Sequence, residues 1–441
     1  MKFKEENSIL LNSFWNRIFL RTSKRSKEPE MRFEFFTGTH CDLKCKYCYL
    51  INHGEALYPE EIQKPDVILN NLKISLDWLI KSVHRPYRID LFGGELLSQE
   101  LGFDCLKLIL DKLKQVKNRP KCIFIPTNYI FLLSDKRTKM VKDFIKCFKR
   151  IRIPVVLSAS FDGKYCEESR PFRGGKEKRD DKYYKKVFSF SKKYHFGFHP
   201  MICSESIENW RKNFLWFQEN FKKFNIPLFR LYLLEVRDAN WSKKQIKKFA
   251  DFIDFLIEWT FSIPCKNDAD KFLDFLFEMK GFNILRAPFI ETGRGIMCAL
   301  QNNFCVRLGD LTITPCHRTS YSPFILGKFR VKNNKIVGIE AKNPELAIAI
   351  RTFDVRSSPL CESCPLKYLC SGGCLGSQFE TTGDLFSPIP TVCQLEHAKI
   401  YAMVKAYKRL GIYNKIYLRL NEDKKNSLDF LDEIMEKIEM Q

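Results

Sequence analysis

The sequence lacks any long run of apolar residues, and this limits the class of protein before any motif is read. No stretch of its 441 residues approaches the roughly 20 consecutive apolar residues needed to span a bilayer. The N-terminus, with Lys2, Lys4, Glu5 and Glu6, also lacks the apolar core of a secretory signal peptide. We therefore expect a cytoplasmic protein with no membrane partner.

Histidine is scarce and cysteine is abundant, with 7 and 17 residues respectively. So many cysteines would suggest disulfides in a small secreted domain, but grouped thiols in a long chain of this kind indicate metal binding. The length allows two or three domains, and the apolar and charged fractions are those of an ordinary globular protein. We therefore expect a folded metalloprotein.

The chain is strongly basic, with a formal net charge of +22. Such a charge attracts polyanions, among them nucleic acid, acidic peptides and phosphorylated ligands. Lysine is abundant along the whole sequence, so the charge by itself does not choose among these partners.

The middle of the chain alternates between predicted strands and segments of helical period. The apolar runs with strand length and composition are 87–92, 121–127, 153–160, 196–203 and 227–236. This alternation predicts an α/β fold with a parallel sheet and crossover helices, closed as a partial barrel of six units.

Polar and glycine-rich segments follow three of these strands. Gly93-Gly94-Glu95 comes after 87–92, Thr127-Asn128 closes 121–127, and Ser160-Phe161-Asp162-Gly163 closes 153–160. Ligands of such sheets bind at the carboxyl ends of the strands. We therefore expect a binding site at this edge of the sheet.

Three cysteines near the N-terminus have the spacing C-x3-C-x2-C, directly after an apolar stretch that is typical of a strand. They are Cys41, Cys45 and Cys48. Three thiolates hold three irons of a four-iron cubane cluster, which leaves the fourth iron open to a non-protein ligand. The alternatives are a zinc site or a structural cluster with a fourth ligand such as His40 or His53.

With Tyr47 directly before its third cysteine, this loop resembles that of the radical S-adenosylmethionine (radical SAM) superfamily. The resemblance implies that the open iron chelates the amino and carboxylate groups of SAM. It also implies that an electron from the cluster cleaves SAM to a 5'-deoxyadenosyl radical, which abstracts hydrogen from unactivated C–H bonds.

The segments at the strand ends extend the resemblance. Gly93, Gly94 and Glu95 look like the family's GGE motif, which binds the methionine amino group of SAM. Taken alone, they are equally typical of a strand-to-helix turn whose carboxylate favours the helix N-terminus. Thr127-Asn128 is similar to a Thr-Asn-Gly turn of the family, with Tyr129 in place of glycine.

A third segment resembles the strand end that faces the SAM ribose, which implies roles for Ser160 and Asp162. Downstream, related enzymes carry His-Asp-x-x-Arg, of which only Arg170 is kept here, because Cys166 and Glu167 replace the first two residues. Arg170 would hold the SAM carboxylate or cap a helix.

The C-terminal third carries a second group of cysteines. Cys361, Cys364, Cys370 and Cys374 have the spacing C-x2-C-x5-C-x3-C; Cys393 follows them, and Cys298, Cys305 and Cys316 precede them. The pattern resembles a SPASM domain, which binds two auxiliary 4Fe-4S clusters in many peptide-modifying radical SAM enzymes. Two zinc centres are the competing interpretation.

The SPASM resemblance also implies how the ligands divide. The first auxiliary cluster would be held by Cys298, Cys305, Cys316 and Cys374, and the second by Cys361, Cys364, Cys370 and Cys393. One departure concerns Gly309, which is separated from Cys316 by six residues, whereas the family usually has four residues between this glycine and the third cysteine. This departure makes Cys305 the least secure of the eight assignments.

His317 directly follows a predicted cluster ligand. In the sulfatase-maturing relatives an Asp at this position is the proposed base that deprotonates the substrate. A histidine titrates near neutrality, which suits a general base and equally suits a hydrogen bond to a cluster sulfur. The replacement argues against simple formylglycine formation.

The predicted organisation has five parts. They are a basic arm (1–31), a radical SAM partial barrel (32–240), a linker of two amphipathic helices (241–290), a SPASM domain (291–395) and a helical tail (396–441). Thirty residues before the barrel are too few for a peptide-recognition domain. A peptide substrate would therefore bind the barrel mouth or be delivered by a separate recognition protein.

The sequence thus predicts a radical SAM enzyme with SAM and three 4Fe-4S clusters that abstracts hydrogen from a peptide or protein. The eight C-terminal cysteines would complete two clusters, so electron transfer is the expected auxiliary role, and a flavodoxin or ferredoxin would be the electron donor. The alternatives are a radical SAM enzyme acting on nucleic acid or a cofactor precursor, and a non-catalytic metal-binding or electron-transfer protein.

Overall fold

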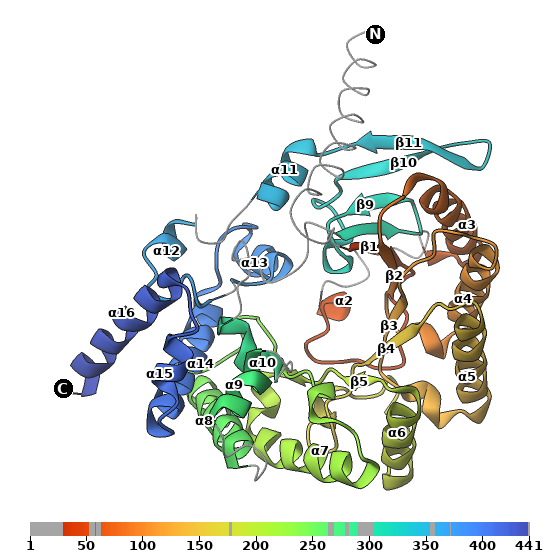
Figure 1. Cartoon of the computed structure of the whole chain (residues 1–441). Helices are drawn as coiled ribbons and strands as arrows, with labels where there is room; N and C mark the ends of the chain where they lie inside the picture. The colour runs from red at the N-terminus through yellow and green to blue at the C-terminus, as the bar shows by residue number, and fades with distance from the viewer. Residues whose placement is uncertain are drawn as a thin grey trace. The chain divides into compact units, whose positions relative to one another are not determined.

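A computed structural model describes residues 30–52, 58, 63–175, 179–262, 269–277, 282–289, 303–352, 358–370 and 372–439 (Figure 1). Two residues named above, His53 and Cys298, lie outside these ranges, as does most of the predicted basic arm. The chain divides into two compact units. Unit 1 comprises Met1–Ser160, Phe172–Val187 and Ala299–Thr352, and unit 2 comprises Phe161–Pro171, Phe188–Cys298 and Phe353–Gln441.

Unit 1 is built on a mixed sheet with a parallel centre. Its strands are β1 (Met31–Phe36), β2 (Tyr87–Phe92), β3 (Ile123–Thr127), β4 (Val155–Ala159), β8 (Asn303–Arg307), β9 (Thr312–Thr314), β10 (Gly327–Lys332) and β11 (Lys335–Ala341). Their order within the unit is β11-β10-β9-β8-β1-β2-β3-β4. The five strands from β8 to β4 in that order pair in parallel, and β9, β10 and β11 extend the sheet by antiparallel pairing.

Helices α3 (Pro65–Ser82), α4 (Glu100–Leu113) and α5 (Asp135–Arg150) connect the parallel strands and lie side by side on one face of the sheet (Figure 1). A parallel pair needs such a crossover, since its strands run in the same direction. α3 begins with Pro65 in its first turn and has Asp66 there and Lys81 in its last turn, which complements the helix dipole. The other helices of the unit are α2 (Tyr49–Asn52) and α11 (Pro344–Thr352), and α6 (Asp181–Tyr194) crosses the boundary between the units in sequence.

The predicted strands 87–92, 121–127 and 153–160 are confirmed as β2, β3 and β4, and the mixed α/β fold with a parallel core is confirmed with them. The prediction of one strand over 196–203 is wrong. Two strands of two residues each, β5 (Gly197–Phe198) and β6 (Met201–Ile202), stand there instead. Pro200 lies between them, and a proline has no N–H to donate to a strand ladder.

The predicted strand 227–236 is also wrong over most of its length. The segment starts with Pro227 and a 3-10 turn, Leu228–Arg230, and only β7 (Leu234–Glu235) is a strand. β7 pairs in parallel with β6, so that Glu235 lies opposite Ile202.

Unit 2 is mainly helical. Its helices are α7 (Trp210–Phe224), α8 (Lys243–Ser262), α9 (Ala269–Phe277), α10 (Asn283–Arg286), α12 (Pro359–Glu362), α13 (Leu375–Thr382), α14 (Pro390–Arg409), α15 (Tyr413–Tyr417) and α16 (Glu422–Glu439). α8 and α14 pack against each other. The core is aromatic, with the Phe214 and Trp259 rings edge to face at 4.9 Å. Helices therefore occupy the predicted linker and tail.

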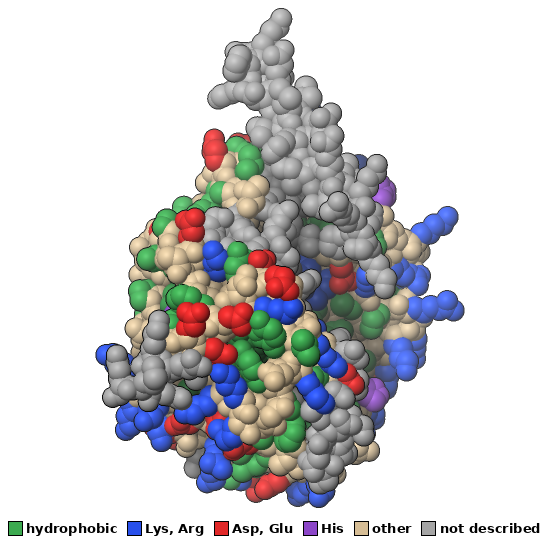
Figure 2. All heavy atoms as spheres, turned by 60° about the vertical axis from the view of Figure 1, so that its left-hand side comes forward, with side chains coloured by type: hydrophobic (Ala, Val, Ile, Leu, Met, Phe, Trp, Pro, Cys, Tyr) green, Lys and Arg blue, Asp and Glu red, His purple; other side chains and the backbone are tan. Residues whose placement is uncertain are grey.

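No helix in the described ranges combines the length and the apolar composition that crossing a membrane requires. Figure 2 shows basic, acidic and apolar side chains interspersed on the face that it displays. On that face, the positive charge is therefore spread among acidic side chains.

Candidate active site

The three thiols of the predicted cluster loop lie in the segment that joins β1 to α2. Cys41, Cys45 and Cys48 are all partly exposed, and Cys41 interacts electrostatically with the other two. The loop is anchored at Leu43, which is buried and forms an antiparallel bridge with Phe172. The loop therefore brings the three thiols together just beyond the carboxyl end of β1.

Cys41 has two hydrogen-bond donors near its sulfur. Leu43 N lies 3.4 Å from Cys41 Sγ, and Asn128 Nδ2 lies 3.8 Å from it. Burial and the nearby Glu95 carboxylate raise the pKa of the Cys41 thiol above its ordinary value. Because a metal binds the thiolate, loading of this site would release a proton.

Gly93 and Gly94 pack against the start of the cluster loop. Gly94 N donates to Gly38 O at 2.9 Å, and a β carbon on Gly94 would lie only 1.8 Å from His40 O. A β carbon on Gly93 would lie 2.6 Å from Gly38 O, and Gly93 has φ +152°. The glycines are therefore required by a close approach between two backbone segments. The ligand-binding site that the sequence predicts at this edge of the sheet stays a prediction.

Glu95 is buried and connects two strand ends. Its Oε1 accepts hydrogen bonds from Thr127 Oγ1 at 2.8 Å and Leu97 N at 3.2 Å, and its Oε2 accepts one from Asn128 N at 2.6 Å. Burial raises the pKa of Glu95 to about 7 in spite of these bonds. The bond from Leu97 N caps the 3-10 turn Leu96–Ser98, so the strand-to-helix alternative describes part of its role.

Tyr129 has φ +63°, in the left-handed region that glycine adopts most readily. The resemblance placed a glycine at this position. Asn128 Oδ1 accepts a hydrogen bond from Ile130 N at 2.9 Å, which closes the turn. The backbone thus has the conformation of a glycine turn although the residue is tyrosine.

The other predicted SAM contacts divide between the units. In unit 1, Ser160 N donates to Thr127 O at 2.8 Å, next to the Glu95 site. In unit 2, Asp162 and Arg170 are both buried, and Arg170 Nε lies 3.0 Å from Asp162 Oδ2. Asp162 Oδ1 also accepts a hydrogen bond from Met201 N at 2.9 Å. Asp162 and Arg170 thus bind each other, and Arg170 also caps the 3-10 turn Glu167–Ser169, where its backbone N–H donates to Glu167 O, as the capping alternative describes.

His317 lies beside the cluster loop in unit 1. Its ring stacks on Phe92 with centroids 3.6 Å apart and an angle of 4°, and it lies 6.0 Å from the ring of Tyr49, which follows Cys48. His317 Nδ1 is 3.1 Å from Glu34 Oε2, and His317 N donates to the same oxygen at 2.8 Å. Two contacts to one carboxylate and one stacked ring therefore fix the orientation of the imidazole.

Glu34 is a candidate site residue that the sequence analysis missed. It lies in β1 with a side chain only 3% exposed, and it also accepts a hydrogen bond from Asn303 Nδ2 at 2.9 Å. A signal was present, because Glu34 stands inside the otherwise mostly apolar strand MRFEFF. A charged residue buried in a strand needs partners, and these partners come from β8 and from the segment after β9.

The ligands predicted for the first auxiliary cluster are not brought together in one described unit. Cys305 is fully buried in β8, with its sulfur 3.4 Å from Ser320 Oγ, and Cys316 lies 3.4 Å from Thr319 Oγ1. Cys374 belongs to unit 2, and Cys298 lies outside the described residues. This ligand set stays a prediction.

Four of the C-terminal cysteines, all in unit 2, gather around one small cavity. Those that line it are Cys361, Cys370, Cys374 and Cys393. Cys364 interacts electrostatically with Cys361 and Cys393, and its sulfur lies 3.5 Å from His397 Nε2. Cys374, which we assigned to the first auxiliary cluster, thus lines the same cavity as three cysteines assigned to the second, and the division of the ligands stays a prediction.

The thiols of the cluster loop and of the C-terminal group suit iron-sulfur clusters by their chemistry and number. No three His, Cys, Asp or Glu side chains in the described ranges converge as the ligands of one metal ion would. Tetrahedral zinc would hold its sulfurs about 3.8 Å apart. In a cluster each thiolate binds a different iron, so the sulfurs stand farther apart.

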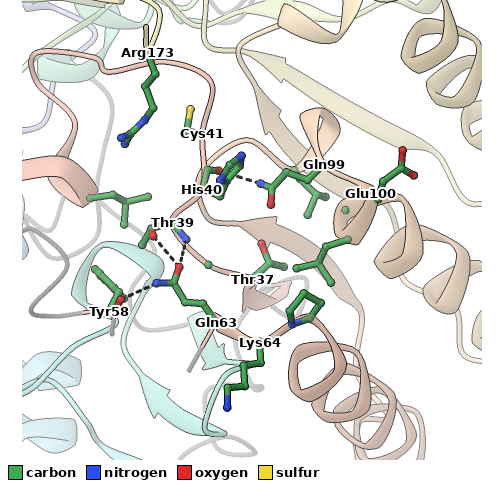
Figure 3. Close-up of a pocket in the computed structure, with 16 residues that line it drawn as sticks. Thr37, Thr39, His40, Cys41, Tyr58, Gln63, Lys64, Gln99, Glu100 and Arg173 are labelled. Carbon is green, nitrogen blue, oxygen red and sulfur yellow. Dashed lines mark hydrogen bonds between the residues drawn. The ribbon is translucent and has the colours of Figure 1, made fainter. Parts of the chain in front are cut away.

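A cavity of about 1100 Å³ opens beside Cys41 in unit 1 (Figure 3). Gln63 shapes one wall: its Oε1 accepts hydrogen bonds from Thr39 N at 2.9 Å and Thr39 Oγ1 at 2.7 Å, and its Nε2 donates to Tyr58 O at 2.7 Å. Figure 3 shows Cys41 and Arg173 near one end of the view and Lys64 near the other. No motif in the sequence pointed to Gln63 or Arg173.

No protein-family model and no curated protein sequence matches the chain. Among solved structures, it is similar to native anSMEcpe with bound AdoMet, at TM-score 0.58 and 16% identity over 87% of this chain and 99% of that one. The structure of native anSMEcpe with bound AdoMet and Cp18Cys peptide gives TM-score 0.57 and 18% identity over the same shares. Streptococcus suis SuiB bound to S-adenosylmethionine gives TM-score 0.48 and 14% identity over 82% and 75%. At these identities the likeness concerns the fold alone, and the chain has a fold similar to that of anSMEcpe.

Proposed function

We propose that the protein is a radical SAM enzyme that cleaves SAM reductively and abstracts hydrogen from a peptide or protein substrate. The observation that carries the proposal is that Cys41, which interacts with Cys45 and Cys48, lies beside Glu95 and Asn128 at the ends of two neighbouring strands. The fold supports it, since the similar anSMEcpe structures hold AdoMet with a Cp18Cys or a Kp18Cys peptide.

The thiols Cys41, Cys45 and Cys48 would hold the first cluster, and Tyr47 would flank it. A 4Fe-4S cluster bound there would supply an open coordination site for SAM and the electron that cleaves it. Asn128 Nδ2, 3.8 Å from Cys41 Sγ, directs a donor at the thiolate and so favours its charged form.

Glu95 would bind the amino group of SAM, beside the backbone of Gly93 and Gly94. Its pKa of about 7 means that the buried carboxylate is only partly ionised at neutral pH. An arriving ammonium group stabilises the ionised form, because a nearby opposite charge lowers the pKa of a carboxyl group. Ser160, Asp162 and Arg170 remain the residues that we propose for the SAM ribose and carboxylate.

His317 would act as the base that removes a proton from the substrate. When Nδ1 donates to Glu34, Nε2 is left as the proton acceptor, and the stacking on Phe92 holds the ring in place. Glu34 is then a positioning residue, since it orients the imidazole.

The C-terminal cysteines would hold two auxiliary clusters, which brings the total to three. Cys361, Cys364, Cys370 and Cys393 are proposed for one, and Cys298, Cys305, Cys316 and Cys374 for the other. Clusters closed by four cysteines leave no iron for the substrate, so their proposed role is electron transfer. A flavodoxin or ferredoxin is the proposed reductant.

The test is 5'-deoxyadenosine production by anoxically reconstituted protein with SAM and a chemical reductant. We expect Cys45→Ala to abolish it while most of the iron stays bound at the C-terminal cysteines. Cys147→Ala is the matched control, because Cys147 is a partly exposed thiol on α5, outside both cysteine groups. Wild-type SAM cleavage by Cys45→Ala would refute the proposal.

A further inference from the structure

Four charged side chains are buried together next to the cysteine cavity of unit 2. Arg237 Nη2 lies 2.7 Å from Glu235 Oε1 and 2.8 Å from Glu396 Oε1. Lys399 Nζ lies 3.0 Å from Glu235 Oε1 and 2.7 Å from Glu396 Oε1. None of the four side chains is more than 5% exposed. We call Glu235, Arg237, Glu396 and Lys399 the buried quartet.

Stability alone gives little reason for such a group. Removing several charges from water costs free energy that their mutual attraction repays only in part, and apolar replacements of buried ion pairs are often as stable. Each of the two carboxylates of the quartet lies against both cations, which oppose the rise that burial causes in the pKa of Glu396. A fixed buried charge can act on whatever is bound beside it.

The quartet is connected to the cysteine turn through its arginine. Arg237 Nη1 donates to Gly372 O at 2.6 Å, and Gly372 N donates to Cys370 Sγ at 3.3 Å. Gly372 has φ +71°, a conformation that favours glycine, so this turn depends on its backbone geometry. Arg237 and Glu396 also line the same cavity as the thiols, whereas Glu235 and Lys399 are not part of its lining.

We propose that Arg237 is the residue that positions the Cys370–Cys374 turn and sets the reduction potential of the cluster bound there. This inference rests on the proposed function, since it requires an iron-sulfur cluster at these cysteines. The Arg237 guanidinium holds the turn at Gly372 O and so directs the Gly372 N–H at the Cys370 sulfur. Glu235, Glu396 and Lys399 keep the guanidinium buried, charged and in one orientation.

The sign of the effect follows from the charges. Reduction adds one negative charge to a cluster, so a positive charge and an N–H donor beside its sulfur favour the reduced state and raise the potential. Glu396 lies on the cavity wall with the opposite charge and lowers the potential. Glu235 contacts Arg237 but does not line the cavity, so its direct effect on the cluster is smaller than that of Glu396.

The experiment uses the full chain with Cys41, Cys45 and Cys48 replaced by Ala, so that only C-terminal clusters remain. After anoxic reconstitution, iron is quantified and the clusters are titrated with redox mediators under EPR detection. In Arg237→Gln we expect the ratio of reduced to oxidised cluster at a fixed potential to fall about tenfold, or about 59 mV for a one-electron couple. Arg237→Lys keeps the charge, and its ratio stays within about twofold of the parent.

Glu396→Gln provides a test of opposite sign, and Glu235→Gln is its matched control within the quartet. We expect the ratio to rise in Glu396→Gln and to change less in Glu235→Gln. If Arg237→Gln fails to accumulate, an unchanged ratio in Glu396→Gln overturns the inference by itself. Arg237→Gln with full iron content and an unchanged ratio overturns it as well. A parent protein that binds no iron overturns the proposed function instead, because no variant then gives a signal.

Discussion

The two cysteine groups of this protein are supported by buried carboxylates in different electrostatic settings. Beside the cluster loop in unit 1, Glu95 is buried with hydrogen-bond donors from Thr127, Asn128 and Leu97, and burial raises its pKa to about 7. In unit 2, burial alone would raise the pKa of Glu235, but Lys399 and Arg237 hold it below its ordinary value.

The two regions differ in whether a buried carboxylate is still available to a positively charged ligand. Among the described residues, the hydrogen-bond donors to the Glu95 carboxylate are two backbone N–H groups and the Thr127 hydroxyl, so a bound cation would gain a strong partner there. Glu235 and Glu396 are already neutralised by two cations. The first region is thus suited to binding a charged substrate, and the second to holding a fixed electrostatic environment.

The largest expected effect separates the two regions by function. We expect Cys370→Ala to lose about one third of the bound iron, since one of three proposed clusters is affected. The cluster loop is untouched, so 5'-deoxyadenosine should still form in the presence of SAM, while the modified peptide does not. Iron quantification and chromatography of both products measure this. Loss of 5'-deoxyadenosine in parallel would show that the regions do not work separately.

The His317 site sharpens the comparison, because it adds acid-base chemistry to unit 1. His317→Ala should lower product formation by about 10²- to 10⁴-fold, the usual contribution of a general base, and leave SAM cleavage in place. Glu34→Gln should lower it less, since the imidazole stays and only its orienting partner changes. Equal SAM cleavage and equal product formation in His317→Ala would exclude the histidine as the base.

The glycine contact tests how tightly unit 1 holds its loop. Gly94→Ala places a β carbon 1.8 Å from His40 O, and we expect a loss of about 4 kcal/mol in the free energy of unfolding. Gly174→Ala is the control, because no atom lies within 4 Å of its β carbon and only its φ of +83° opposes the change. Its expected cost is about 1 kcal/mol. Denaturant titration measures both, and equal losses would contradict the packing argument.

The smallest effect concerns pH. The pKa of Glu95 is raised from its ordinary 4.5 to about 7, so the folded state binds this proton more tightly than the unfolded state does. Its contribution to stability is therefore present below about pH 4.5 and is lost as the pH rises to about 7, by up to about 3 kcal/mol. We expect Glu95→Gln to flatten this part of the pH dependence in iron-free protein. An unchanged slope would contradict the assignment of the shift to Glu95.

The sequence predicted much of unit 1 because its signals are local. The strands 87–92, 121–127 and 153–160 each carry apolar composition over a few residues, and their order indicates the parallel core. The prediction failed at 196–203, which Pro200 interrupts, and at 227–236, which begins with Pro227 and a 3-10 turn. The prediction used apolar composition and length, and neither criterion takes account of a proline within the segment.

The sequence by itself determined the spacing of Cys41, Cys45 and Cys48, because seven peptide bonds hold these thiols near one another in any fold. Only the tertiary structure decided the partners of the buried carboxylates Glu34 and Glu235. Glu34 and His317 are 283 residues apart, and Glu235 and Lys399 are 164 apart. Such pairs form when packed strands and helices bring distant segments together, and no local pattern of residues encodes that proximity.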